Sequence, residues 1–331
     1  MNPLRIAVVG MGKMGLVHAS ILSSMPNVEI VGLCEKSRVL RRMVKPLFKS
    51  AQAVDDLEKL SDLNLNAVYV TTPIPTHFSI IRTLFSQRIS ENIFVEKTLT
   101  TDSEKANELC ILPQTLEGVT MVGYMKRFAV TFAKAKQILA ENILGKTVSF
   151  DAYAYSSDFL GVKSGSLKTG SRGGVLSDLG SHVIDLALWF FGDFQVEAAS
   201  LISIIGGTWE DAANFEVKKS GLRGHFRTSW CMENYRLPSF GLTVKGDKGK
   251  MVVDDYSVRL ELKDCRPRNW FRHDLDDHVA FLLGESEYYR EDEAFVNAVL
   301  SGSPIQPDFA TASQVDSVID QVKKRGKKNG S

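Results

Sequence analysis

The sequence lacks the features that mark several specialised classes of protein. Only four of its 331 residues are cysteines, and none shows the C-x-x-C or Cys/His spacing of a metal site. No apolar run approaches the ~18 residues that span a bilayer. Lys and Arg number 40 against 39 Asp and Glu, so the net charge of +1 creates no field for nucleic acid or an anionic membrane. We expect reduced thiols, no metal, no nucleic-acid or membrane partner and, with no room for a signal peptide before the first strand, a cytoplasmic location.

The glycine-rich stretch near the N-terminus is the most informative part of the sequence. Residues 5–15 read RIAVVGMGKMG, in which the apolar run Ile6–Val9 is typical of a strand buried in a parallel sheet. Gly10, Gly12 and Gly15 follow with the spacing G-x-G-x-x-G. The first glycine permits a tight strand-to-helix turn, the second lets a diphosphate approach the backbone, and the third lets the helix pack on the strand. The pattern predicts a dinucleotide site, although a glycine-rich turn in another α/β fold also fits it.

The end of the next expected strand bears on which dinucleotide binds. The strand Val28–Cys34 is followed by Glu35, twenty positions after Gly15, where a Rossmann fold places the carboxylate that binds the adenosine ribose. A carboxylate there accepts hydrogen bonds from free ribose hydroxyls and repels a 2′-phosphate, which favours NAD. Lys36 and Arg38 could neutralise that phosphate, so NADP stays open.

The order of the expected elements changes near residue 123. Up to that point strands and helices alternate, which indicates a doubly wound parallel sheet. The expected strands are Ile6–Val9, Val28–Cys34, Asn66–Thr71, Ile93–Val95 and Val119–Val122. From Val196 to Leu262 strands follow one another without helices, which indicates an antiparallel sheet, and two helices close the chain. We predict an α/β fold with a dinucleotide-binding Rossmann domain over residues 1–123 and an α+β domain over residues 124–331.

A second motif, GGVLSDLGSHVID at residues 173–185, combines an acid with a histidine. We expect a helix over residues 174–191, on which Asp178 and His182 lie four positions apart and share one face. A histidine oriented by a carboxylate is a good general base near neutral pH. Equally, Asp178 could cap a helix and His182 could be a buried core residue. Lys97 favours chemistry, because it ends a strand at the edge of the sheet where a nicotinamide is expected, although a lone lysine is by default a solvated residue.

Five motifs together resemble one family. They are GMGKMG at residues 10–15, TTPIPTH at 71–77, VEKT at 95–98, YMKRF at 124–128 and GGVLSDLGSHVIDLALWFFG at 173–192. On these motifs the chain is identified as a member of the glucose-fructose oxidoreductase, inositol dehydrogenase and rhizopine catabolism (Gfo/Idh/MocA) family, and the resemblance covers nearly its full length. It implies a Rossmann domain, then a substrate-binding domain with a large open sheet often used for homodimers or homotetramers. It also implies redox chemistry at a carbinol of a sugar, cyclitol or nucleotide-linked sugar.

The resemblance also assigns roles to residues. Lys97 is the lysine of the family's Glu-Lys-Pro motif, and Asp178 and His182 are the Asp and His of its D-x-x-x-H motif. The expected contacts to the diphosphate, ribose and nicotinamide are Gly10, Gly12, Lys13, Met14, Gly15, Thr72, Pro73, His77 and Glu96, with Lys97 beside the nicotinamide. Thr98 replaces the proline of that motif. Because a cis bond costs about 2.5–4 kcal/mol before a non-proline residue and about 0.5–1 before proline, we expect a trans bond between Lys97 and Thr98.

A mechanism follows from these charges. As NAD takes hydride from a secondary alcohol, we expect His182 to accept the hydroxyl proton while Asp178 orients its ring. Lys97 would donate a hydrogen bond to the same oxygen and stabilise the developing negative charge. Arg127 and Tyr153 are further candidate substrate contacts. Lys163, Lys168 and Arg172, in the loop before the helix, could meet a carboxylate or phosphate, or could form an exposed polar loop.

Two other functions remain open from the sequence. An NAD-dependent glycosidase or epimerase would use tightly held NAD for transient oxidation. A dinucleotide-sensing regulator would have little need for Lys97, Asp178 and His182 together. The substrate, the direction of reaction and the oligomeric state are not indicated.

Overall fold

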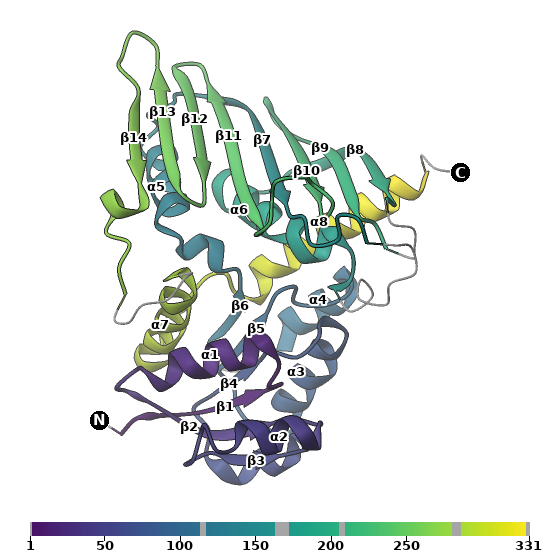
Figure 1. Ribbon diagram of the computed structural model, residues 1–331, viewed down its shortest axis with the longest axis vertical. Coiled ribbons are helices and arrows are strands. Elements are labelled where there is room, and N and C mark those ends of the chain that lie inside the picture. Colours follow the sequence, from purple (N-terminus) through teal and green to yellow (C-terminus); the bar gives the residue numbers. More distant parts are fainter. Residues whose placement is uncertain (1, 113–116, 163–171, 205–208, 280–285, 329–331) are drawn as a thin grey trace. The chain divides into compact units, whose positions relative to one another are not determined.

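The chain forms two compact units (Figure 1). The computed structural model describes residues 2–112, 117–162, 172–204, 209–279 and 286–328. The first unit comprises Met1–Tyr124 and Tyr288–Ser313, and the second comprises Met125–Glu287 and Gln314–Ser331. Among the described residues no helix combines the length and the apolar character needed to cross a membrane, and none of the four cysteines forms a disulfide.

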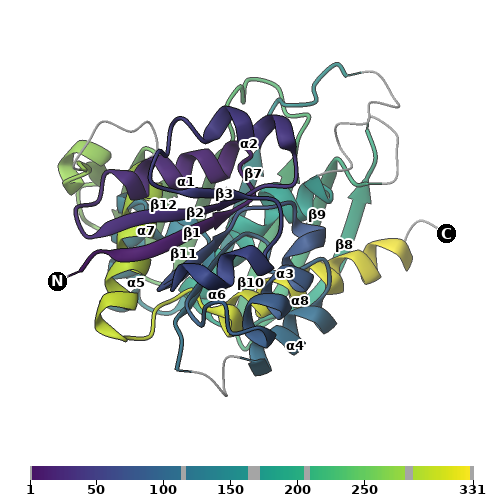
Figure 2. The same cartoon turned by 90° about the horizontal axis from the view of Figure 1, so that it is seen from below.

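The first unit contains a six-stranded parallel sheet with the strand order β3-β2-β1-β4-β5-β6. Its strands are β1 (Leu4–Val9), β2 (Val28–Cys34), β3 (Gln52–Val54), β4 (Ala67–Val70), β5 (Ile93–Glu96) and β6 (Thr120–Gly123). Its first helices are α1 (Lys13–Ser23), α2 (Arg38–Val44), α3 (His77–Ser86) and α4 (Ser103–Ile111). Helices α1 and α2 cover one face and α3 and α4 the other (Figure 2), which confirms the doubly wound prediction. The strand order reverses between β1 and β4, so a crevice is expected beyond their carboxyl ends.

Helix α7 (Ser286–Ser301) brings a late part of the chain into the first unit. The ring of Phe295 lies 5.4 Å from that of Tyr69 on β4 and 5.8 Å from that of Phe94 on β5. All three side chains are fully buried. Aromatic pairs at these separations stabilise the fold beyond the burial of their surface. Helix α7 therefore belongs to the apolar core that Tyr69 and Phe94 form on the sheet.

The second unit is organised on an eight-stranded sheet with the order β14-β13-β12-β11-β7-β10-β9-β8. Its strands are β7 (Thr147–Tyr155), β8 (Gln195–Ile202), β9 (Ala212–Lys219), β10 (Leu222–Ser229), β11 (Ser239–Gly246), β12 (Gly249–Asp254), β13 (Ser257–Leu262) and β14 (Arg268–Phe271). Only β7 and β10 pair in parallel among these strands, so the prediction of a mainly antiparallel sheet is confirmed. Helices α5 (Val130–Ala140), α6 (Ser181–Phe191) and α8 (Phe309–Lys328) lie along one face (Figure 1).

Alternation along β7 separates the two faces of this sheet. Phe150, Ala152 and Ala154 are buried on the helical face, where the ring of Phe150 stacks on that of Phe191 with 4.6 Å between centroids. Tyr153 is partly exposed and, because successive side chains of a strand point to opposite faces, lies on the open face. His182, the catalytic candidate on α6, therefore lies on the side of Phe150 and not on that of Tyr153.

Candidate active site

The glycine-rich turn after β1 has the geometry expected of a diphosphate site. Gly10 has a φ of +92°, which favours glycine, and a Cβ on Gly15 would lie 2.0 Å from the carbonyl oxygen of Gly10. A Cβ on Gly12 would meet nothing within 4 Å, so this side of the turn is open to a ligand. Helix α1 begins directly after Gly12, with no acidic residue in its first turn. The residues present therefore fit the anionic part of a dinucleotide.

Glu35 closes the other side of this turn. Its Oε2 accepts a hydrogen bond from the backbone N–H of Met11 at 2.9 Å, and its Oε1 accepts one from that of Ser37 at 2.8 Å. Carboxylate oxygens carry further lone pairs, so the group can still accept bonds from a ribose diol. Lys36 is exposed beside it.

The segment after β4 is tied to the glycine turn and to the end of β5. Thr71 Oγ1 donates to the carbonyl oxygen of Gly10 at 2.6 Å. His77 is fully buried, with Nε2 2.7 Å from the carbonyl oxygen of Thr72 and Nδ1 2.9 Å from that of Thr98. Burial lowers the pKa of His77, although both carbonyls oppose this. The buried imidazole braces the two backbone segments, while Thr72 is partly exposed and Pro73 exposed at the rim.

Lys97 directly follows β5, at the same edge of the sheet as Gly10 and Thr72. The expectation of a trans bond between Lys97 and Thr98 is wrong, because this peptide bond is cis. The expectation rested only on the intrinsic preference of a peptide bond before a non-proline residue for the trans form. In the folded chain, Thr98 is 1% exposed, its carbonyl faces His77, and its hydroxyl donates to the carbonyl oxygen of Thr100 at 3.1 Å. The contact with His77 joins segments 21 positions apart, so it has no signal in the local sequence.

Asp178 and His182 occupy successive parts of one irregular helix in the second unit. The helix expected over residues 174–191 is present, but residues Leu176–Gly180 form a π-helical turn and α6 begins only at Ser181. π-helical turns occur mostly as single turns and frequently at functional sites. His182 is 4% exposed, and its ring lies edge-on to that of Phe240 with 5.1 Å between centroids.

The carboxylate of Asp178 is held by two donors. Its Oδ2 accepts hydrogen bonds from Nε1 of Trp230 at 3.0 Å and from Nη1 of Arg172 at 3.2 Å. The same Arg172 nitrogen lies 2.6 Å from Oδ2 of Asp158. From the sequence, Arg172 was expected only as a possible contact to an anionic ligand, and Trp230 had no specific role. Their shared contact with Asp178 has no signal in the sequence. Lys163 and Lys168 lie outside the described residues.

The turn that carries Asp178 is fixed at its start by a buried acid. Glu210 Oε1 accepts a hydrogen bond from the backbone N–H of Leu176 at 3.2 Å. Gly174 has a φ of +91°, and a Cβ there would lie 2.2 Å from that same oxygen. The second glycine of the GG pair therefore gives the carboxylate access to the turn. Glu210 was not identified from the sequence, because an isolated acid carries no motif.

The two further substrate candidates, Arg127 and Tyr153, each have partners within the second unit. Arg127 is 6% exposed and makes a bidentate ion pair with Asp185, at 2.8 Å from Nε and 2.6 Å from Nη2. The charge of Arg127 is therefore paired within the second unit, with an acid of α6. Tyr153 lies on the open face of the sheet, where its ring stacks on that of Tyr155 with 5.1 Å between centroids.

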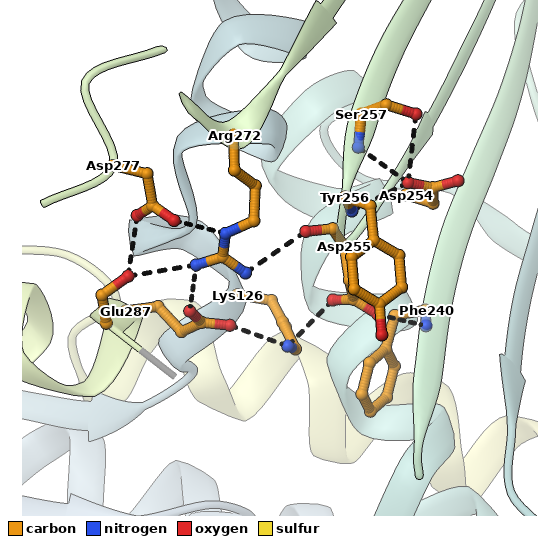
Figure 3. Close-up of polar contacts among 10 residues, drawn as sticks. Lys126, Phe240, Asp254, Asp255, Tyr256, Ser257, Arg272, Asp277 and Glu287 are labelled. Atoms are coloured by element: carbon orange, nitrogen blue, oxygen red, sulfur yellow. Dashed lines mark hydrogen bonds and ion pairs between the residues drawn. The ribbon is translucent and has the colours of Figure 1, made fainter. Parts of the chain in front are cut away.

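A buried ion cluster lies where the chain enters and leaves the second unit. Lys126 Nζ is 2.9 Å from Oδ1 of Asp255 and 2.9 Å from Oε1 of Glu287, and Arg272 Nη2 is 2.9 Å from Oε2 of Glu287 (Figure 3). Although burial raises it, the charges of Lys126 and Arg272 hold the pKa of Glu287 below its usual value. Lys126 Nζ also lies 5.1 Å from the centre of the Phe240 ring. The cluster therefore supports the side chain that packs on His182.

Two family models match this chain. One describes an oxidoreductase family with an NAD-binding Rossmann fold and matches residues 4–124. The other describes the Gfo/Idh/MocA C-terminal domain and matches residues 132–252. Together they cover well over half of the sequence, on both sides of the change in architecture.

Named relatives extend over the whole chain. The chain is 22% identical to inositol 2-dehydrogenase from Rhizobium meliloti, across 96% of this chain and 97% of that protein. It is 23% identical to myo-inositol 2-dehydrogenase from Thermotoga maritima, across 91% of this chain and 90% of that one. Among solved structures, levoglucosan dehydrogenase in complex with NADH and L-sorbose has a TM-score of 0.88 at 20% identity, covering 99% of this chain and 98% of that chain, which shows a shared fold. The chain therefore belongs to the Gfo/Idh/MocA family of oxidoreductases, and residues 4–124 are its NAD-binding Rossmann domain.

Proposed function

We propose that the protein is an NAD(P)-dependent dehydrogenase that moves a hydride between nicotinamide and a secondary alcohol or ketone of a sugar, cyclitol or nucleotide-linked sugar. Lys97, Asp178 and His182 are the catalytic residues of this proposal. The main observation in its support is the set of hydrogen bonds to Asp178. Trp230 and Arg172 orient its carboxylate on a π-helical turn directly before His182. A family oxidoreductase that retains this arrangement has the groups that proton transfer needs.

We assign cofactor binding to the first unit. Gly10, Gly12 and Gly15 would admit the diphosphate, with Lys13 and Met14 beside it, and Glu35 would accept the ribose hydroxyls, with Lys36 nearby. Thr72, Pro73, Glu96 and Lys97 stand at the carboxyl ends of β4 and β5, where the nicotinamide half is expected. His77, being buried, would act by bracing the Thr72 and Thr98 segments. The bound nicotinamide supplies hydride transfer, and the protein supplies position and charge.

The proton chemistry is assigned to the second unit together with Lys97. His182 would take the hydroxyl proton during oxidation and return it during reduction. Lys97 would donate a hydrogen bond to the same oxygen and stabilise its negative charge as the C–H bond breaks. Arg127, which is paired with Asp185, would hold α6 and so position His182, in place of the substrate contact expected from the sequence.

The substrate class rests on the named relatives. Two of them carry names of inositol dehydrogenases, and one solved structure of the same fold is named for a sugar dehydrogenase and contains a sugar. A neutral polyol suits a site in which the reacting oxygen needs one base and one cationic donor. We therefore place cyclitols and aldoses before uronic acids and nucleotide sugars.

A substrate panel tests this function directly. Purified protein is mixed with cyclitols, aldoses, uronic acids and nucleotide sugars, with NAD or NADP, and absorbance at 340 nm is followed. We expect NADH formation with at least one cyclitol or aldose. Product formation without net NADH, with the cofactor retained, would instead identify an epimerase or glycosidase, and saturable NADH binding without any turnover would identify a regulator.

We also propose that the open face of the eight-stranded sheet joins copies of this chain into a homodimer or homotetramer. Within the described residues, α5, α6 and α8 all lie on the opposite face. The open face presents a mixed surface, with Asp151 and His225 3.7 Å apart on adjacent strands and the stacked rings of Tyr153 and Tyr155 nearby. Aromatic residues beside polar groups are typical of protein interfaces.

A further inference from the structure

One buried charged cluster in the first unit takes no direct part in the proposed chemistry. The side chain of His18, on α1, is fully buried. Its Nδ1 lies 2.7 Å from Oδ1 of Asp292, and its Nε2 lies 3.0 Å from Oε1 of Glu96. Asp292 belongs to α7 and Glu96 ends β5, so one imidazole joins three elements.

The surroundings of His18 favour its charged form. Although burial lowers it, Asp292 and Glu96 raise the pKa of His18 well above its usual value. An imidazolium has two N–H groups and can donate to both carboxylates at once, whereas a neutral ring can donate to only one. Burial raises the pKa of Glu96, but the bond from His18 and its charge outweigh this and lower it. Glu96 therefore stays ionised although its side chain is buried.

The second oxygen of Glu96 carries the cluster to the candidate catalytic lysine. Its Oε2 accepts a hydrogen bond from the backbone N–H of Lys97 at 3.1 Å. A carboxylate held through its first oxygen by a charged donor has little freedom to turn, because charge-assisted hydrogen bonds are short and strong. Through Glu96, His18 therefore sets the direction of the Lys97 N–H, and with it the position of the Lys97 Cα from which the side chain extends.

We propose that His18 is a positioning residue that acts on Lys97 through Glu96, with Asp292 holding the imidazole from the other side. This inference rests on the catalytic role proposed above for Lys97. Because α1 begins at the glycine-rich turn, the same histidine also connects the helix next to the diphosphate site with the segment that carries Lys97.

Hydrogen exchange tests the structural part of this proposal without a substrate. Asp292→Asn leaves an oxygen that can accept from Nδ1 but removes the charge that favours the imidazolium. We expect the Lys97 amide, followed by NMR, to exchange at least about tenfold faster than in the wild type, because its acceptor becomes mobile. His18→Gln, which can donate to Glu96 but not also to Asp292, is a second variant with the same expected direction.

Glu291→Gln is the matched control, because it removes a neighbouring buried carboxylate on α7. We expect exchange at Lys97 to stay at the wild-type rate in this variant. Wild-type exchange at Lys97 in either folded test variant, Asp292→Asn or His18→Gln, would overturn the proposal. Equal acceleration in Glu291→Gln would do the same, since it would indicate general loosening of α7.

A double-mutant cycle tests the functional part. With the panel compound that gives the fastest NADH formation, Asp292→Asn should slow single-turnover hydride transfer roughly 10- to 100-fold while leaving NADH affinity nearly unchanged, because a small misplacement of a catalytic group has this effect. In a Lys97→Ala background the same change should cost less than about twofold, because both changes remove one contribution. Full additivity would overturn the proposal. Wild-type turnover by Lys97→Ala would instead contradict the proposed function, and hydrogen exchange would still decide whether His18 holds Lys97.

Discussion

Single carboxylates in this protein do different work according to the donors around them. Glu35 accepts two backbone N–H groups at the mouth of the glycine turn and is partly exposed, so it can meet a ligand. Asp185 is fully buried against Arg127 and cannot. The residue type alone does not separate these roles. The position of Glu35 after a strand and twenty residues from Gly15 does, which is why it could be identified from the sequence.

Glu35 should set the preference between the two cofactors. We predict that Glu35→Gln, which removes the charge but keeps one acceptor, raises the ratio of kcat/KM for NADP to that for NAD at least about tenfold, or about 1.4 kcal/mol. The physical reason is the loss of repulsion towards a 2′-phosphate. The measurement is initial rates with both cofactors on the best panel substrate.

Glu29→Gln is the control for this change, because Glu29 is an acid on β2, the strand that ends directly before Glu35, and is paired at 3.7 Å with Arg5. Its ratio should match the wild type. A Glu35→Gln ratio equal to that of Glu29→Gln would show that the ribose is held elsewhere.

The elements that the sequence predicted well are those with long apolar patterns. The run at Val28–Cys34 gave β2 with its observed bounds. Strands β3 and β14 have three and four residues and few buried positions, so no period could be read. The π-helical turn before α6 was missed because its hydrogen bonds, not its side chains, distinguish it from an α-helix.

Tertiary partnerships were the other limit of the sequence. The period of α7 indicates a helix with an apolar face, but not that this face packs on the first unit through Phe295. Likewise, His18 and Asp292 are 274 positions apart, and neither belongs to a motif that names the other. The catalytic candidates could be identified from the sequence because each belongs to a local motif.

The Lys126 cluster should be an important source of stability for the second unit. We predict that Lys126→Met, which keeps the length of the side chain but removes the cation that the buried Asp255 and Glu287 share, lowers the free energy of unfolding by about 3–5 kcal/mol. All four tryptophans, Trp189, Trp209, Trp230 and Trp270, lie in this unit, so tryptophan fluorescence during urea unfolding reports on it specifically.

Lys324→Met is the control, because Lys324 is an exposed lysine of the same unit. Its effect should stay within about 0.5 kcal/mol. Equal unfolding midpoints for the two variants would show that the cluster contributes nothing to the stability of the unit.

The same cluster predicts a pH dependence. The pKa of Glu287 is lowered in the folded state, so its stabilisation is present above the unfolded value and is lost as the pH falls through the folded pKa. Below pH 4.5, the usual value for Glu, the wild type should therefore lose stability more steeply than Glu287→Gln. Parallel curves of unfolding free energy against pH for the two proteins would contradict this assignment.

At the scale of the whole molecule, the open sheet face should determine assembly. Sedimentation velocity of the wild type should give two or four times the mass of one chain. His225→Glu places a second acid beside Asp151 on that face, and we predict a shift towards the single-chain mass, because two carboxylates without a cationic partner are costly to bury in an interface. A wild type that sediments as a single chain would remove the basis for this surface.

The central claim is the proposal that one lysine and one histidine act on the same substrate oxygen. The most direct test is single-turnover hydride transfer, followed at 340 nm, in Lys97→Ala and His182→Ala, with NADH affinity measured by fluorescence titration. We expect each variant to lose roughly 10²- to 10⁴-fold in rate while binding NADH nearly as well as the wild type. Hydride transfer at the wild-type rate in either variant would contradict it.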